Sequence, residues 1–109
     1  METKSAVDAL AALAQETRLA VFRLLVEAGA VGLPVGEIAA SVKSSPATLS
    51  FHLKELAHAG LILARPQGRF IYYSANYPRM NELLRYLTEN CCARDCGRRL
   101  KTPTSRRNR

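Results

Sequence analysis

The sequence predicts a mainly α-helical domain with one small β-hairpin, an α+β fold in a single chain of 109 residues. Apolar residues recur at intervals of three and four through most of the chain, which is typical of amphipathic helices. Residues 61–74 break this pattern with a β-prone run, and Gly68 lies within it where a hairpin turn needs a positive φ. No stretch reaches the roughly 18 to 20 apolar residues of a membrane span, so no membrane partner is expected.

Two helices are predicted at the start of the chain. Residues 3–13 carry Val7, Leu10 and Leu13 among alanines, a spacing that favours a first helix. Residues 17–28 are apolar on most sides, so the second helix is expected to lie buried at the centre of the domain.

The strongest helix signal covers residues 45–59. Ser45 suits the N-cap, Pro46 suits the first helical position, and Gly60 suits the left-handed position just past the end. One side of this helix is apolar and consists of Leu49, Leu53 and Leu56. The opposite side is expected to carry short polar side chains that can reach base edges in a major groove, namely Thr48, Ser50, His52 and Glu55.

The segments on either side of this helix complete a known supersecondary pattern. Residues 34–42 predict a shorter helix, and a tight turn at residues 43–44 would join the two helices into a helix-turn-helix. Downstream, residues 61–65 and 69–74 predict two strands with a turn at residues 66–68. A helix-turn-helix followed by a hairpin is a winged helix-turn-helix, which predicts double-stranded DNA as the partner.

Positive charge is concentrated in two places. The formal net charge is +7, yet residues 1–93 hold nine basic and eight acidic side chains, so most of the excess belongs to the basic tail at residues 94–109. Arg65 and Arg69 flank the predicted tip of the wing, where cations meet phosphates or the minor groove. The side chains predicted to bind DNA are Ser45, Thr48, Ser50, His52, Arg65 and Arg69.

A last helix is predicted after the wing. Pro78 suits a helix start, and a narrow apolar stripe follows, made of Met80, Leu83, Leu84 and Leu87. The sequence therefore divides into a winged helix-turn-helix domain over residues 1–93 and a basic tail over residues 94–109. The tail has two interpretations, a solvated segment or a second contact to DNA phosphates.

Three segments of the chain, residues 16–25, 50–62 and 65–73, closely resemble the ArsR/SmtB family, and the likeness extends over about residues 8–87. That family consists of bacterial winged-helix repressors that leave DNA when metal ions or other effectors bind. The resemblance implies a homodimer paired through its first and last helices, although packing on its own core is the alternative for the first helix. The resemblance also gives His52 a second interpretation, as a residue with a structural role rather than a DNA contact.

A two-fold dimer would set its recognition helices about 34 Å apart, one DNA turn, so the operator is expected to be an inverted repeat. The beginning of the sequence carries acids and lacks the long apolar centre of a signal peptide, so a cytoplasmic location is expected. No glycine-rich phosphate loop of the kind that enzymes use occurs, and no enzyme activity or constitutive cofactor is expected.

All three cysteines lie within six residues, as Cys91, Cys92 and Cys96. Their sulfurs would not converge on one ion from a regular helix, but a loop beyond the last helix could gather them. Three thiolates without a nearby histidine form a soft donor set, which suits trivalent arsenic or antimony, whereas zinc normally wants a fourth ligand. The three cysteines are therefore the predicted metal ligands.

Two ligand patterns of the family are missing: no Cys-x-Cys occurs in residues 34–42, and no Asp or His in residues 78–90. Some family members instead carry a C-terminal vicinal cysteine pair with a third cysteine and respond to trivalent arsenic. The resemblance to them favours As(III) or Sb(III) as the effector. Other thiophilic metals, redox sensing through a cysteine pair, and no effector role remain open alternatives.

Overall fold

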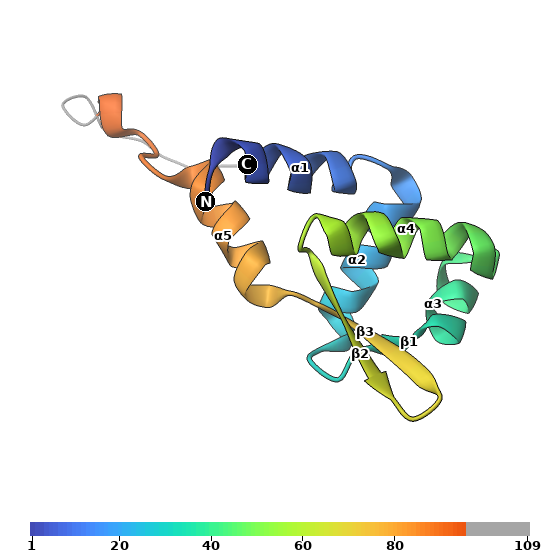
Figure 1. The fold of residues 1–109 in the computed structure, drawn as a ribbon. Coiled ribbons are helices and arrows are strands. Elements are labelled where there is room, and N and C mark those ends of the chain that lie inside the picture. Colours follow the sequence, from blue (N-terminus) through green and yellow to red (C-terminus); the bar gives the residue numbers. More distant parts are fainter. Residues whose placement is uncertain (96–109) are drawn as a thin grey trace.

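A computed structural model describes residues 1–95 and confirms the predicted fold class, a winged helix-turn-helix (Figure 1). Cys96 and the rest of the tail lie outside the described residues. In chain order the described elements are α1 (Thr3–Leu13), α2 (Glu16–Ala28), β1 (Leu33–Pro34), α3 (Val35–Val42), α4 (Pro46–His58), β2 (Ile62–Gln67), β3 (Phe70–Ala75), α5 (Tyr77–Thr88) and a 3₁₀ turn (Ala93–Asp95). None of the helices within residues 1–95 is long and apolar enough to cross a bilayer.

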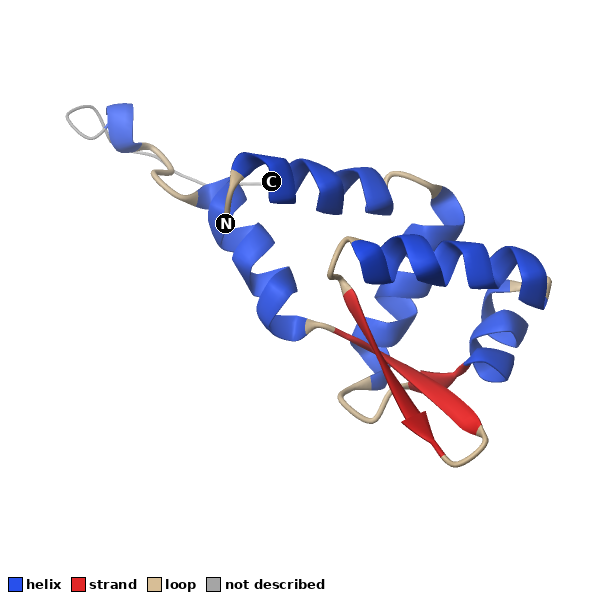
Figure 2. Ribbon diagram, in the orientation of Figure 1, coloured by secondary structure: helices blue, strands red, loops and turns tan. Residues whose placement is uncertain are grey.

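The wing is larger than the hairpin predicted from the sequence. Strands β2 and β3 pair antiparallel from Ile62↔Ala75 to Gln67↔Phe70, and β1 adds a short third strand on the other side of β3 (Figure 2). The predicted turn at residues 66–68 is wrong, because Pro66 and Gln67 belong to β2 and the chain reverses at Gly68 and Arg69. Pro66 is tolerated there because β2 is an edge strand, where a missing N–H leaves no ladder bond unmade.

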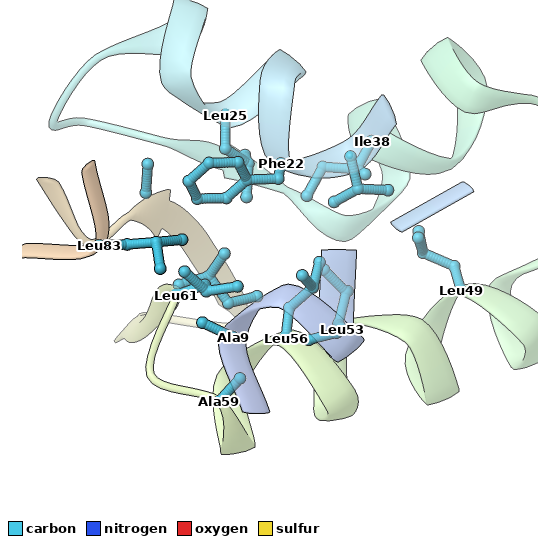
Figure 3. Close-up of a cluster of buried hydrophobic side chains, with 14 of the residues drawn as sticks. Ala9, Phe22, Leu25, Ile38, Leu49, Leu53, Leu56, Ala59, Leu61 and Leu83 are labelled. Atoms are coloured by element: carbon cyan, nitrogen blue, oxygen red, sulfur yellow. The ribbon is translucent and has the colours of Figure 1, made fainter. Parts of the chain in front are cut away.

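The hydrophobic core lies between α2 and the helices around it (Figure 3). As predicted, α2 is the central helix, with Val21, Phe22 and Leu25 all buried. Helix α4 contributes the buried leucines expected from its apolar stripe, Leu49, Leu53 and Leu56. Burying each of these side chains stabilises the fold by about 1.5–3 kcal/mol before the entropy cost is counted.

Both ends of α4 are capped as the sequence predicts. The Ser45 hydroxyl accepts a hydrogen bond from the Thr48 N–H at 3.3 Å. At the other end Gly60 has a φ of 79°, and its N–H donates to the Ala57 carbonyl while the Leu61 N–H donates to the Leu56 carbonyl. These two bonds form a Schellman motif, which satisfies the last carbonyls and ends the helix.

Asn76 joins the end of α4 to the start of α5. Its backbone N–H donates to the Leu61 carbonyl at 2.9 Å, and its side-chain Nδ2 donates to the Gly60 carbonyl at 2.8 Å. The same side chain accepts the Arg79 N–H through Oδ1 at 3.3 Å, which caps α5. One residue therefore fixes the last helix to the C-terminal end of the recognition helix.

Helices α1 and α5 contact one another, and the Thr3 and Tyr86 hydroxyls are hydrogen-bonded at 2.6 Å. Leu83 of α5 is buried, but other apolar side chains of the two helices remain between 42% and 55% exposed. We call these residues the α1–α5 apolar surface: Val7, Leu10, Leu84 and Leu87. Large apolar side chains left exposed on two neighbouring helices are typical of a protein–protein interface.

Candidate DNA-binding surface and cysteine turn

The recognition helix α4 presents its outer face to solvent. Lys43, in the left-handed conformation with a φ of 54°, ends α3 and turns the chain toward α4. The exposed side chains of the first three turns of α4 are Pro46, Ala47, Thr48, Ser50, Phe51 and Lys54. Thr48 and Ser50 lie on the exposed side, as the sequence predicts, and the Ser45 hydroxyl is also exposed but serves as the cap.

His52 is a correction, because it does not lie on the outer face. Its side chain is only 8% exposed and its Nδ1 lies 3.3 Å from Nη1 of Arg18. On a helix, residue 52 is three positions after Leu49 and one before Leu53, so all three share the core side. Because a guanidinium only donates, Nδ1 is assigned as the acceptor and the ring proton to Nε2. The structural interpretation of His52 is therefore the correct one.

Arg18 is a functional candidate that the sequence prediction missed. Its Nε donates to the Ala12 carbonyl at 2.7 Å, and its Nη1 reaches His52. Arg18 thus connects the C-terminal end of α1, through the start of α2, with the recognition helix. A cation in the first turn of the central helix was the available signal, but the hydrogen-bond partners of Arg18 lie 6 and 34 residues away in the chain.

The two arginines of the wing lie in different surroundings. Arg65 is held along the strand: its Nη2 donates to the Val31 carbonyl at 3.0 Å, and its guanidinium stacks over the Tyr72 ring at 5.4 Å. Arg69 occupies the turn at the exposed tip of the wing. Arg69 is therefore the wing cation better placed to meet a phosphate, and DNA contact by either arginine stays a prediction.

Replacing Lys54 with alanine is expected to weaken DNA binding uniformly across sequences, because Lys54 is the cation on the outer face of α4. Each lost phosphate contact should reduce the slope of log K against log salt concentration by about 0.9, so the two copies in the proposed dimer should together reduce it by about 1.8. Titration of a duplex of random sequence at several salt concentrations measures that slope. Lys4→Ala on α1 is the control, and an unchanged slope for Lys54→Ala would show that Lys54 does not face the backbone.

Cys91 and Cys92 follow α5 in a tight turn rather than extending the helix. The Cys91 N–H donates to the Thr88 carbonyl at 3.0 Å, and Cys92 has a φ of 62°. The Sγ atoms of Cys91 and Cys92 lie 3.6 Å apart and both residues are exposed. Among residues 1–95 no cluster of three or more potential metal ligands occurs, and Cys96 lies outside them. The prediction of a loop beyond the last helix is confirmed for this pair.

A capped recognition helix with an exposed polar face, supported by a second helix and followed by a wing, defines a DNA-binding transcriptional regulator. Residues 13–64 match the family model described as a helix-turn-helix domain. The uncharacterized HTH-type transcriptional regulator MJ1325 of Methanocaldococcus jannaschii is 30% identical over 86 residues, which cover 79% of this chain and 94% of that protein.

Solved structures give the same result. An ArsR-like transcriptional regulator from Rhodococcus sp. RHA1 superimposes with a TM-score of 0.73 at 26% identity, over 86% of both chains. The homodimeric winged helix-turn-helix DNA-binding domain of Mb0332 from Mycobacterium bovis, a possible ArsR-family regulator, gives a TM-score of 0.63 at 26% identity, over 80% of this chain and 81% of that one. The chain belongs to the ArsR family of winged helix-turn-helix transcriptional regulators.

Proposed function

We propose that the protein is a homodimeric repressor that leaves its operator when As(III) or Sb(III) binds Cys91, Cys92 and Cys96. The observation that carries this proposal is the 3.6 Å separation of the first two sulfurs in an exposed turn. Two sulfurs that share one ion through bonds of about 2.3 Å lie roughly 3.3–3.8 Å apart, for bond angles between a right angle and the tetrahedral angle. The pair is thus spaced to hold a soft ion.

The third sulfur would come from Cys96, four residues after Cys92. In the binding step, three thiols replace the three hydroxyls of arsenous acid and release three waters, so the donor set matches the valence of the ion. A soft metal that needs four ligands would find only three sulfurs here, and solvent would fill its fourth coordination position. This ligand count favours a trivalent metalloid over zinc.

The dimer is proposed to form through the α1–α5 apolar surface, whose residues are half exposed in the single chain. The homodimeric state named for the similar Mb0332 domain supports a dimer, and the exposed apolar side chains of α1 and α5 support its location. A two-fold axis through that surface would present two copies of α4 about 34 Å apart to successive major grooves. An inverted-repeat operator follows from this symmetry.

The fold connects the cysteine turn to the DNA surface through α5. The turn follows the C-terminal end of α5, while Asn76 fixes the other end of α5 to the end of α4 (Figure 1). An ion that reorders the turn would shift α5 against its partner helix and carry α4 with it. A hundredfold loss of DNA affinity needs about 2.7 kcal/mol of coupling, and operator DNA must weaken arsenite binding by the same factor.

Titration of the reduced protein with arsenite tests this proposal. One arsenic per chain is expected, seen as sulfur-to-arsenic absorption in the ultraviolet, with release of bound operator at the same stoichiometry. The variant with Cys91, Cys92 and Cys96 all changed to serine should show neither signal and should still bind DNA. No absorption change, or a response to zinc alone, would contradict an arsenic-responsive site.

The spacing of Cys91 and Cys92 also favours a second candidate, a redox-responsive repressor of the same fold. Here two thiols would lose two electrons and two protons to hydrogen peroxide, giving one disulfide and two waters. DNA release by peroxide that dithiothreitol reverses, without any release by arsenite, would identify this function.

A further inference from the structure

Phe51 is an apolar side chain at the centre of an otherwise polar surface. It is 56% exposed and lies between Thr48, Ser50 and Lys54 on the outer face of α4. The leucines of the same helix, Leu49, Leu53 and Leu56, lie instead in the buried core (Figure 3). Phe51 is not a member of the hydrophobic core formed by the described residues.

The orientation of the Phe51 ring is restricted by contact with the neighbouring His52 ring. The ring of Phe51 stands edge-on to the ring of His52, with 5.7 Å between the centroids and 61° between the planes. His52 is itself buried and held by Arg18, which also binds the Ala12 carbonyl. The Phe51 ring therefore packs against a fixed side chain, although the residue remains 56% exposed to solvent.

The chemistry of the major groove offers such a ring a single kind of apolar partner. Guanine, cytosine and adenine present donors and acceptors there, whereas thymine also presents its C5 methyl group. A phenyl ring placed against polar edges would strip water from them without replacing the hydrogen bonds. Against a methyl group it removes apolar area of both partners from water, which is favourable.

We propose that Phe51 is a specificity-determining residue that reads a thymine methyl group in each half-site of the operator. The proposal rests on DNA binding by α4 and is independent of the effector. The occupant is assigned to DNA because Phe51 continues the surface formed by Thr48, Ser50 and Lys54, while the α1–α5 apolar surface lies on other helices.

The test uses duplexes in which single thymines are replaced by uracil, which lacks only the methyl group. The preferred sequence is first selected from random DNA with the full-length protein. Burial of one methyl is worth about fourfold in affinity, so uracil at the read position should weaken wild-type binding about fourfold in one half-site and about fifteenfold in both. Phe51→Ala should bind the thymine duplex more weakly and should no longer distinguish thymine from uracil at that position.

Two further variants make the result specific. Phe70→Ala removes an equally exposed phenylalanine, 61% exposed on the wing, and should keep the thymine preference of the wild type. Phe51→Leu retains an apolar group and should keep part of the preference for thymine over uracil. Equal binding of thymine and uracil at every position by the wild type would overturn the proposal, as would full discrimination retained by Phe51→Ala. If no preferred duplex can be selected from random DNA, sequence-specific DNA binding is wrong, and the proposal for Phe51 falls with it.

Discussion

Replacement of both Leu84 and Leu87 with glutamate is expected to convert the proposed dimer into monomers and to reduce operator affinity by about a hundredfold or more. Both leucines are 54% exposed in the single chain, so glutamate at these positions is tolerated by the isolated fold. In a two-fold interface each new carboxylate occurs twice, and burying an unpaired charge costs several kcal/mol. Loss of the dimer removes the second half-site contact, which is the source of the affinity loss.

Sedimentation at micromolar concentration measures the oligomeric state of the Leu84→Glu, Leu87→Glu variant, and titration of the selected operator measures its affinity. Leu19→Glu is the matched control, because Leu19 is 45% exposed but belongs to α2 rather than to α1 or α5. The control should sediment and bind as the wild type does. A double variant that still sediments as a dimer would place the interface elsewhere on the molecule.

Replacement of Gly32 with alanine is expected to destabilise the fold by about 3 kcal/mol or more, a large effect for one methyl group. Gly32 has a φ of 80°, which other residues rarely adopt. A Cβ at this position would overlap the carbonyl oxygen of Tyr73 and lie 3.2 Å from Cβ of Ser74. Both neighbours belong to β3, which pairs with β1 immediately after Gly32, so relief of the overlap requires breaking that pairing.

Thermal unfolding checks this prediction, and a drop in Tm of at least about 10 °C is expected for Gly32→Ala. Gly36→Ala is the control, because Gly36 lies in α3 and a Cβ there has no neighbour within 4 Å. That substitution should be neutral or stabilise the protein by up to about 1 kcal/mol, since alanine is the better helix former. A Tm for Gly32→Ala close to the wild-type value would mean that the loop before β1 can rearrange.

The sequence alone determined the elements whose signals are local. Helix α1 spans the predicted residues at both ends, and α4 begins after the Ser45 cap and is closed by Gly60. Caps, proline at a helix start and the apolar period act over one or two helical turns, so a single sequence carries them fully. The turn that follows α5 and presents Cys91 and Cys92 was predictable for the same reason.

The tertiary structure decided which polar side chains of α4 are exposed. Polarity placed His52 on the outer face, but the packing of α4 against α2 buries it, while Phe51 beside it stays exposed. The histidine is tolerated inside because Arg18, 34 residues earlier in the chain, supplies a hydrogen-bond donor. No local pattern contains that partner.

Strand pairing decided the shape of the wing in the same way. The register of β2 with β3 moves the reversal to Gly68 and Arg69, and β1 is too short to be recognised without its partner strand. Arg65, which the sequence placed where cations meet phosphates or the minor groove, is held along the wing by Val31 and Tyr72, and its contact with DNA stays a prediction. The sequence by itself determined which segments are helical and how α4 is capped, because those features depend on neighbours in the chain. Which helix faces meet, and hence which side chains remain exposed, depends on contacts between distant segments.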